Sequence, residues 1–168
     1  MLRIAITGPE SSGKTTLSAA LAEHYKVSHI PEFARTYLGK TKGQYQQSDL
    51  DIIAQGQLKS LDSFKGYIAI CDTDFFVLEL WSQYKYNSVS HYIKELVSKD
   101  FFDLHVLCTP DIPWEPDPLR ETPNSRDALF ELYKTNLNTY KKNFILVNGT
   151  HENRFKKSVQ AIDLLIKV

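Results

Sequence analysis

The stretch Gly8-Pro-Glu-Ser-Ser-Gly-Lys-Thr15 decides the fold, because it matches the phosphate-loop pattern GxxxxGK[ST] in full. Glycines let such a loop curl, so that successive backbone N–H groups point at phosphate oxygens. The lysine places a positive charge on the β- and γ-phosphates, and the hydroxyl that follows is a ligand for Mg²⁺. The sequence therefore predicts a site for ATP and Mg²⁺ formed by Gly8, Pro9, Glu10, Ser11, Ser12, Gly13, Lys14, Thr15 and Thr16.

The segments on both sides of this loop have the context that the motif requires. Residues 2–7 (LRIAIT) are short, apolar and rich in β-branched side chains, which predicts a strand. Residues 14–26 carry apolar side chains at helical spacing. The motif lies between an expected strand and an expected helix, as a phosphate loop does. A chance match to Gly-Lys-Thr therefore explains it poorly.

The rest of the chain alternates between expected strands and expected helices. Further strands are predicted at 27–30, 67–71, 103–108 and 144–147, and helices at 48–64, 75–84, 90–99 and 125–142, with a last helix ending near residue 166. Ser48 is the expected N-cap of the 48–64 helix. We predict one domain over 1–168: a three-layer α/β/α P-loop NTPase fold with a five-stranded, mostly parallel sheet, similar to nucleoside and nucleotide kinases.

Composition excludes several classes of function. The 168 residues include 20 Lys plus Arg and 20 Asp plus Glu, so the formal net charge is zero. A general nucleic-acid binder or a polybasic membrane binder needs a positive face, so neither is expected, and the expected partner is a small molecule. We find no signal peptide and no apolar run long enough to span a membrane, and we expect a cytoplasmic protein. Cys71 and Cys108 lie in apolar runs and are expected to be buried thiols.

Three carboxylates follow expected strands, at the edge of a parallel sheet where ligands bind. Asp72 is in the position of a Walker B carboxylate, which holds Mg²⁺ directly or through water; accepting the proton of an attacking hydroxyl is its alternative role. Asp74 could hydrogen-bond a sugar diol, whereas Asp72 could instead cap the next helix. Glu32 could be a base, a magnesium ligand or a partner of Arg35, which we also place in the substrate site.

The segment 110–126 is rich in proline and cannot form a regular helix or strand, so we predict that it is a lid over the site. Its Arg120 and Arg126 would clamp phosphates and neutralise charge during transfer. Trp114 is either an anchor of the lid or a platform for a flat substrate ring. After the last strand, Gly149 and Thr150 are candidates to face the adenine, although a simple strand-to-helix turn explains them equally well.

Taken together, the phosphate loop GPESSGKT, the motif Glu32-Phe-Ala-Arg35, the motif Asp72-Thr-Asp74 and the segment from Pro110-Asp-Ile-Pro-Trp114 to Arg120 resemble the ribosylnicotinamide kinase domain of the bacterial bifunctional NAD-biosynthesis regulators. The resemblance spans nearly the whole chain. It implies transfer of the γ-phosphate of ATP to the 5′-hydroxyl of nicotinamide riboside. It also implies that Lys14 and Thr15 handle phosphates and Mg²⁺, that Asp72 and Asp74 lie near metal and ribose, and that Arg120 and Arg126 belong to a mobile lid.

The chain departs from that family in two respects. Full-length members carry an adenylyltransferase domain and often a DNA-binding domain upstream, whereas this sequence begins at its first strand, so we expect neither activity here. Family members place an aromatic residue before the Glu-aromatic-small-Arg motif, where this chain has Pro31. If that aromatic stacks on nicotinamide, another side chain must replace it, and the candidates are Phe33, Tyr37, Trp81 and Tyr84.

Two alternatives to a nicotinamide riboside kinase remain at this stage. The acceptor could be another nucleoside or a nucleoside monophosphate, although outside the lid only Arg35 is well placed to meet a second phosphate. The chain could also be a P-loop ATPase or a nucleotide-dependent switch that acts on a protein partner. The sequence does not decide the oligomeric state.

Overall fold

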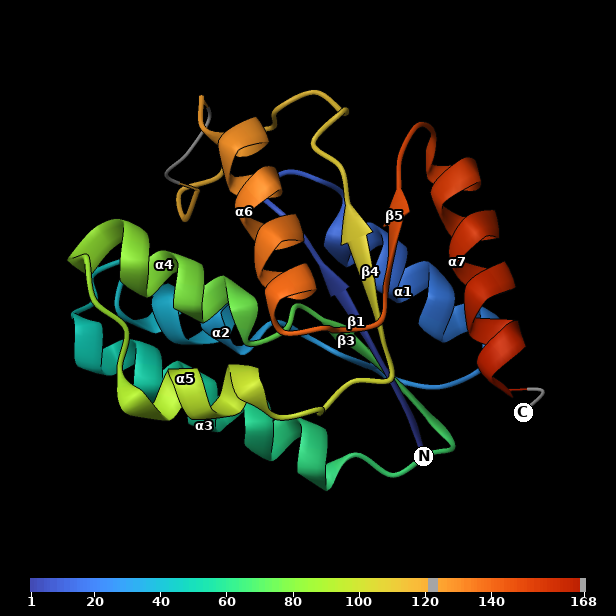
Figure 1. The fold of residues 1–168 in the computed structure, drawn as a ribbon, viewed down its shortest axis with the longest axis horizontal. Helices are drawn as coiled ribbons and strands as arrows, with labels where there is room; N and C mark the ends of the chain where they lie inside the picture. Colours follow the sequence, from blue (N-terminus) through green and yellow to red (C-terminus); the bar gives the residue numbers. More distant parts are fainter. Residues whose placement is uncertain (121–123, 167–168) are drawn as a thin grey trace.

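The computed structural model describes residues 1–120 and 124–166. Five strands form one parallel sheet in the order β2-β3-β1-β4-β5, which confirms the expected fold class (Figure 1). The strands are β1 (Leu2–Thr7), β2 (His29–Ile30), β3 (Ile68–Asp72), β4 (Leu104–Cys108) and β5 (Phe144–Val147). Because every pair is parallel, the carboxyl ends of the strands meet at one edge, where ligands bind in open α/β sheets.

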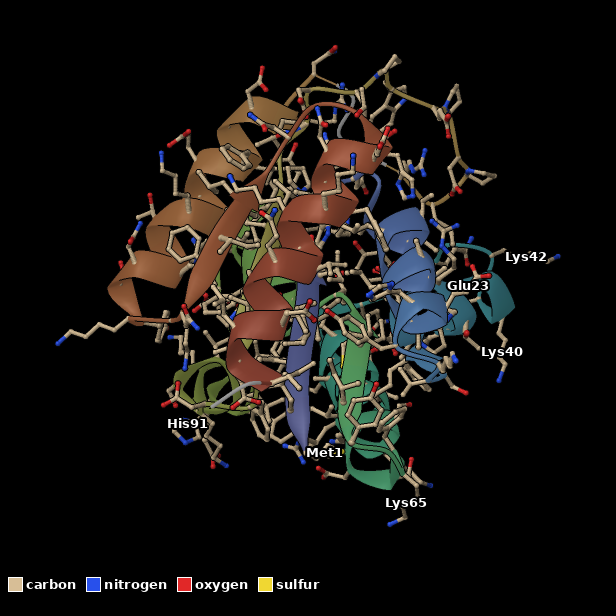
Figure 2. The ribbon with its side chains drawn as sticks, turned by 90° about the vertical axis from the view of Figure 1, so that its right-hand side faces the viewer. Met1, Glu23, Lys40, Lys42, Lys65 and His91 are labelled. Atoms are coloured by element: carbon tan, nitrogen blue, oxygen red, sulfur yellow. The ribbon has the colours of Figure 1, made fainter. Side chains whose placement is uncertain are left out.

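Helices cover both faces of the sheet and complete three layers. On one face α1 (Lys14–His24) packs against α7 (His151–Ile166) (Figures 1 and 2). The other face carries the remaining helices, which are α2 (Phe33–Lys40), α3 (Gln47–Ser63), α4 (Phe76–Tyr86), α5 (His91–Ser98) and α6 (Arg126–Thr139). The charged side chains of Glu23, Lys40 and Lys65 lie at the periphery of the molecule (Figure 2).

The side chains of β1 point alternately to the two faces of the sheet, which lets a layer of helices pack on each face. Ile4 and Ile6 are fully buried in the core beneath α1 and α7, whereas Ala5 belongs to the core under the other helices. Successive side chains of a strand point to opposite faces, so one apolar strand supplies both cores. Cys71 and Cys108 are buried free thiols, as expected, and burial raises their pKa values to about 12 and about 11.

Several sequence-based boundaries need correction. The Ser48 N-cap is wrong: α3 starts at Gln47 after its N-cap Gln46, whose backbone N–H donates to the Asp49 carboxylate at 2.7 Å. Helix α2 was not predicted: it has only eight residues, although Phe33, Ala34, Tyr37 and Leu38 form a partly buried stripe that packs against the core. The strand expected at 67–71 is shifted by one residue, so that Asp72 is itself the last residue of β3. Within the described residues, none of the helices is long and apolar enough to cross a membrane.

Candidate active site

The phosphate loop joins β1 to α1 at the carboxyl edge of the sheet. Gly8 has a φ of 132°, and a Cβ at this position would stand 2.6 Å from the carbonyl oxygen of Cys108 on β4. Gly13 caps α1 in the left-handed region with a φ of 81°, and Ser11 between them also has a positive φ. The ammonium of Lys14 donates to the carbonyl of Pro9 at 2.7 Å, so the loop is curled around this side chain.

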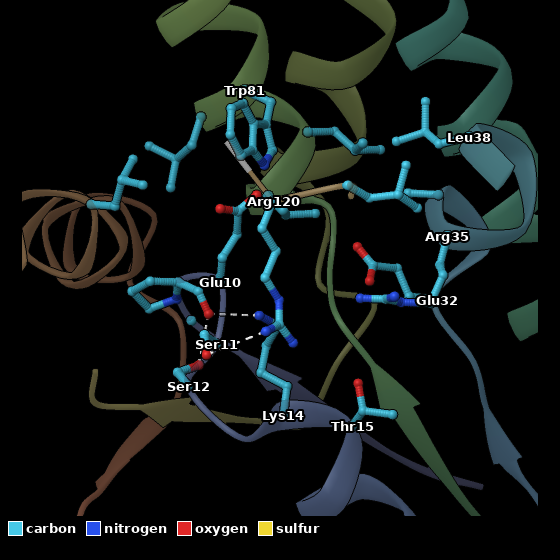
Figure 3. A pocket seen from close by; sticks show the side chains of 18 of the residues that line it. Glu10, Ser11, Ser12, Lys14, Thr15, Glu32, Arg35, Leu38, Trp81 and Arg120 are labelled. Carbon is cyan, nitrogen blue, oxygen red and sulfur yellow. Dashed lines mark hydrogen bonds between the residues drawn. The ribbon is translucent and has the colours of Figure 1, made fainter. Parts of the chain in front are cut away.

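A cavity of about 240 Å³ opens beside this loop. Residues 8–16, the phosphate loop in which the nucleotide site is predicted, form its floor. Glu32 and Arg35 line the side formed by α2, and Arg120 reaches down toward Ser11 from the opposite side (Figure 3). The far half is apolar and includes three aromatic side chains, Tyr45, Trp81 and Tyr133, together with Leu38, Leu50, Ile53, Leu80 and Leu129.

Glu32 lies where the phosphate loop meets the apolar half of the cavity. The surrounding walls exclude much of the water around Glu32, and this burial raises the pKa of its carboxyl. The negative charge of Asp72 raises this pKa further, whereas the positive charge of Lys14 lowers it. A carboxylate with a raised pKa is a better proton acceptor than a solvated one. Glu32 also interacts electrostatically with Arg35.

Asp72 is 2% exposed and does not line the cavity, although its charge acts on Glu32 and Arg35. Its Oδ1 is buried and, within the described residues, has no hydrogen-bond partner. Thr73, the next residue, has a φ of 83°, which is an unfavourable conformation for a β-branched side chain. Strained backbone of this kind is often retained at functional sites, and here it separates two buried carboxylates.

The structure turns Asp74 toward a helix rather than into the cavity. Its Oδ1 accepts from the backbone N–H of Phe76 at 3.0 Å, at the start of α4. Its Oδ2 lies 3.7 Å from Nε2 of the buried His105. Burial raises the pKa of Asp74 to about 6 and lowers that of His105 to about 4. The helix contact that the sequence suggested for Asp72 is made by Asp74 instead, and the expected contact of Asp74 with a sugar stays a prediction.

The segment between β4 and α6 crosses the phosphate loop. Part of the lid predicted at 110–126, namely residues 121–123, lies outside the described residues. Trp114 lies between the two predicted arginines, with the Arg120 and Arg126 guanidinium carbons 5.8 and 5.7 Å from its ring centre. Arg126 donates to the backbone carbonyls of Ser11 and Ile112, at 3.1 and 3.0 Å, and does not line the cavity. Trp114 does not line the cavity, and its two alternative roles stay predictions.

Gly149 and Thr150 are exposed and do not line the cavity, so their expected place beside the adenine stays a prediction. Tyr45 was not predicted from the sequence: it lines the cavity from the loop before α3, with the Lys85 ammonium 3.7 Å from its ring centre. Of the four candidates to replace the missing aromatic, Trp81 lines the cavity, whereas Phe33, Tyr37 and Tyr84 do not.

No cluster of three or more His, Cys, Asp or Glu side chains that could hold a metal occurs within the described residues. A magnesium ion bound with a nucleotide needs only one or two carboxylates, because phosphates and waters supply the other ligands. The Thr15 hydroxyl and the unpartnered Asp72 Oδ1 are hard oxygen donors of the kind that Mg²⁺ prefers. The residues present therefore fit this ion.

Comparison with known proteins identifies relatives of this chain. The chain is 31% identical over 95% of its length to the trifunctional NAD biosynthesis/regulator protein NadR of Salmonella typhimurium, and 34% identical over 74% to that of Escherichia coli. It spans only 41% and 32% of the length of these proteins.

Solved structures share the fold. A NadR protein in complex with NR matches 99% of this chain and 52% of its own, with a TM-score of 0.79 and 17% identity. A deoxyadenosine kinase from M. mycoides with bound dATP matches with a TM-score of 0.59 and 13% identity, covering 97% of this chain and all of its own. A shikimate kinase from Acinetobacter baumannii in complex with shikimate has a TM-score of 0.56 and 14% identity over 99% of this chain and 94% of its own.

The fold is thus that of P-loop small-molecule kinases. The family model described as AAA domain, AAA_28, matches residues 3–154, which is most of the chain. This protein therefore belongs to the AAA_28 family of P-loop AAA domains and is related to the NadR proteins.

Proposed function

We propose that the chain is an ATP-dependent kinase that transfers the γ-phosphate to the 5′-hydroxyl of a ribonucleoside, with nicotinamide riboside as the first candidate. The observation that carries this proposal is one cavity that joins the phosphate loop to an apolar half with aromatic walls, with Glu32 between them. The phosphate loop suits the donor, and Tyr45 and Trp81 suit a flat ring on the acceptor. The relationship to NadR supports nicotinamide riboside as the acceptor.

In the proposed reaction the acceptor oxygen forms a bond to the γ-phosphorus, while the bond from this phosphorus to the bridging oxygen of ADP breaks. The hydroxyl proton passes to a carboxylate, and the position and raised pKa of Glu32 suit this role. Lys14 and Arg120 neutralise charge on the transferring group. Asp72 and Thr15 would hold Mg²⁺, which when bound would neutralise charge on the phosphates.

An uncharged acceptor suits the site better than a nucleoside monophosphate. Arg35 is the cation on the acceptor side of the cavity, and its guanidinium already donates to the carboxylate of Asp117 at 2.9 Å. A second phosphate in this place would have to compete with that carboxylate. We therefore rank nucleoside monophosphates below nucleosides.

The direct test is to incubate the protein with Mg·ATP and a panel of nucleosides and nucleoside monophosphates, nicotinamide riboside included, and to measure ADP and product masses. Phosphorylated riboside is the expected product. Turnover with a different acceptor, and none with nicotinamide riboside, would identify that molecule as the substrate instead. ADP release without any phosphorylated product would favour an ATPase or a switch that acts on a protein.

Lys14→Ala should lower turnover by roughly 10²- to 10³-fold, because a charge that stabilises the transferring phosphate is lost. Lys157→Ala, in an exposed position on α7 far from the phosphate loop in sequence, is the matched control and should leave turnover unchanged. Full activity of the Lys14→Ala protein would show that the phosphate loop is not the site of transfer.

A further inference from the structure

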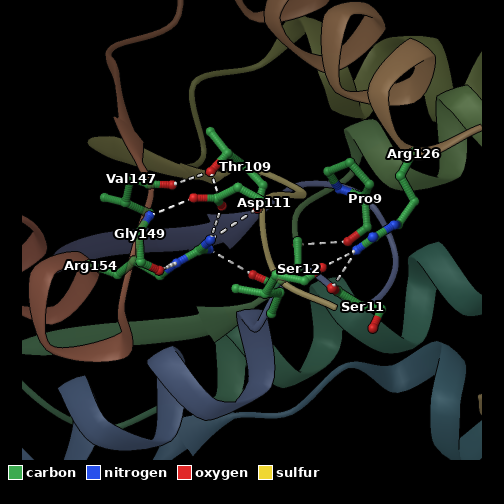
Figure 4. A network of polar contacts seen from close by, with 10 residues as sticks. Pro9, Ser11, Ser12, Thr109, Asp111, Arg126, Val147, Gly149 and Arg154 are labelled. Atoms are coloured by element: carbon green, nitrogen blue, oxygen red, sulfur yellow. Dashed lines mark hydrogen bonds and ion pairs between the residues drawn. The ribbon is translucent and has the colours of Figure 1, made fainter. Parts of the chain in front are cut away.

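Arg154 is a buried charge to which the proposed reaction gives no role. It lies in the first turn of α7, is 3% exposed, and points across the carboxyl edge of the sheet (Figure 4). Its Nε donates to the carbonyl of Gly149 at 2.9 Å, and its Nη1 donates to the carbonyl of Ser12 at 2.9 Å. Its Nη2 donates to the carbonyl of Thr109 at 3.2 Å and also to the carboxylate of Asp111.

Asp111 completes the same network from the other side. Its Oδ2 accepts from the backbone N–H of Gly149 at 2.6 Å, and its Oδ1 accepts from the Thr109 hydroxyl. That hydroxyl also lies 3.1 Å from the carbonyl of Val147, at the end of β5. Partial burial raises the pKa of the Asp111 carboxyl, but the hydrogen bonds from Thr109 and Gly149 and the charge of Arg154 lower it below its usual value overall. Asp111 is therefore ionised at neutral pH.

The two side chains join three loops that are far apart in sequence. One is the phosphate loop after β1, the second is the start of the segment after β4, and the third is the loop after β5 (Figure 4). Gly149 is held on both sides, by its N–H and by its carbonyl, with a φ of 76° that favours glycine.

The hydrogen bond from Arg154 to the carbonyl of Ser12 bears directly on the phosphate loop. No cis peptide bond occurs in the described chain, so the peptide between Ser12 and Gly13 is trans, and its C=O and N–H point in opposite directions. When Arg154 fixes the carbonyl of Ser12, the N–H of Gly13 must point away from Arg154. In phosphate loops such amides are aimed at phosphate oxygens, and their orientation decides how well the anion is held.

We propose that Arg154 and Asp111 are positioning residues for the nucleotide: together they fix the Ser12–Gly13 peptide and lock the loops after β4 and β5 to the phosphate loop, so that the nucleotide meets a preformed site. This inference rests on the proposed function only in that a nucleoside triphosphate binds at the phosphate loop. A purely structural role, in which Arg154 only attaches α7 to the sheet, makes a different prediction: stability would fall and nucleotide affinity would not.

The test measures binding rather than turnover. Calorimetry with Mg²⁺ and a non-hydrolysable ATP analogue gives the Kd of the wild-type protein and of Arg154→Lys, which keeps the charge but loses the planar fork of donors. We expect the Kd to rise at least about tenfold, since a loop displaced by a fraction of an ångström loses its alignment with the ligand. In kinetic assays the KM for ATP should rise, while the KM for the acceptor at saturating ATP stays within about twofold.

Arg3→Lys is the matched control, because Arg3 lies at the opposite end of β1 and its side chain forms a partly exposed ion pair of 3.8 Å with Asp62. Its Kd should equal that of the wild-type protein. Asp111→Asn is the second variant, in case Arg154→Lys does not fold: its side chain is 40% exposed, and it keeps an acceptor for Gly149 while losing the charge.

The outcomes separate the two proposals. If a folded Arg154→Lys or Asp111→Asn protein binds the analogue with the wild-type Kd, the positioning role is wrong, whatever happens to the melting temperature. If the wild-type protein itself binds no nucleotide, the proposed function fails and this inference fails with it. A higher Kd in either folded variant, with the Arg3→Lys protein unchanged, supports the inference.

Discussion

The guanidinium Nη1 of Arg35 on α2 lies 2.9 Å from the carboxylate Oδ2 of Asp117, in the segment between β4 and α6. The other oxygen of Asp117 accepts from the backbone N–H of Leu119 at 2.9 Å, so the carboxylate is fixed within its own loop. Because Arg35 lines the cavity, this ion pair links the cavity wall to the segment that crosses the phosphate loop. If the cavity holds the acceptor and the segment is a lid, as we propose, the pair couples acceptor binding to lid closure.

We predict that Asp117→Ala raises the KM for the acceptor roughly fivefold, in line with an ion pair worth about 1 kcal/mol, and increases ATP hydrolysis without acceptor. The melting temperature should hardly change, because the Arg35 side chain is 48% exposed. Steady-state kinetics with and without acceptor would measure both effects. Glu95→Gln removes the exposed ion pair with Lys99 on α5 and is the matched control. Equal kinetics for the two variants would mean that the Arg35–Asp117 pair has no role in closure.

A pair of glycine substitutions tests the geometry of the phosphate loop. Gly8→Ala would force a Cβ to within 2.6 Å of the Cys108 carbonyl oxygen at a φ of 132°. We expect it to lower the free energy of unfolding by about 2 kcal/mol or more and to weaken nucleotide binding. Gly39→Ala on α2 meets nothing within 4 Å, so it should raise the free energy of unfolding by about 0.5–1 kcal/mol. Urea unfolding of both variants measures the difference, and a stable, nucleotide-binding Gly8→Ala protein would contradict this geometry.

The two tryptophans should separate phosphate transfer from acceptor binding. Trp114 holds Arg120 and Arg126 at its ring faces, whereas Trp81 lines the apolar half of the cavity. We predict that Trp114→Leu lowers kcat roughly tenfold, because cation–π contacts of about 0.5–2 kcal/mol are lost and the arginines are no longer aligned. Trp81→Leu should instead raise the KM for the acceptor with little effect on that for ATP. If both variants change the same kinetic parameter, the assignment of the two aromatic side chains is wrong.

Much of this fold follows from local patterns in the sequence. The phosphate loop is a continuous motif whose residues act on one ligand, so its spacing was sufficient to predict its place between β1 and α1. The buried strands were found for a similar reason: runs such as Ile68–Asp72 are apolar on both faces because helices cover both sides of the sheet. Helix α2 was missed because it has only eight residues, so its stripe of Phe33, Ala34, Tyr37 and Leu38 spans little more than two turns.

The roles of side chains far from the motif depend on tertiary structure. The role of Arg154 could not be predicted, because sequence spacing cannot show that its acceptors are backbone carbonyls of three different loops. The partners of Asp74 could not be predicted either: the carboxylate follows a strand, and only the fold shows that it accepts from a helix N–H and lies beside a buried histidine. Tyr45 reaches the cavity from a loop whose path no periodicity defines.

The last prediction concerns pH and the buried His105 on β4. It is 2% exposed, it packs against the rings of Phe76 and Phe102, and burial lowers its pKa to about 4 from a usual value of 6.5. The charged groups that face it are Asp74, 3.7 Å from its Nε2, and the pair of Lys142 and Asp100.

Because the folded pKa of His105 is the lower one, the unfolded chain binds more protons between about pH 4 and 6.5. The contribution of His105 is therefore fully present above pH 6.5 and is lost as the pH falls toward 4, by up to about 3 kcal/mol. The His105→Gln protein lacks this pH-dependent contribution to the free energy of unfolding. We predict that the free energy of unfolding of the wild-type protein, minus that of the His105→Gln protein, decreases as the pH falls from 7 to 4.5.

Urea unfolding at a series of pH values measures this difference. His91→Gln, an exposed histidine at the start of α5, is the matched control and should differ from the wild-type protein by a nearly constant amount. A constant difference for His105→Gln as well would mean that this histidine keeps its ordinary pKa in the folded protein. The comparison needs no substrate, so its outcome is independent of the function proposed for the cavity.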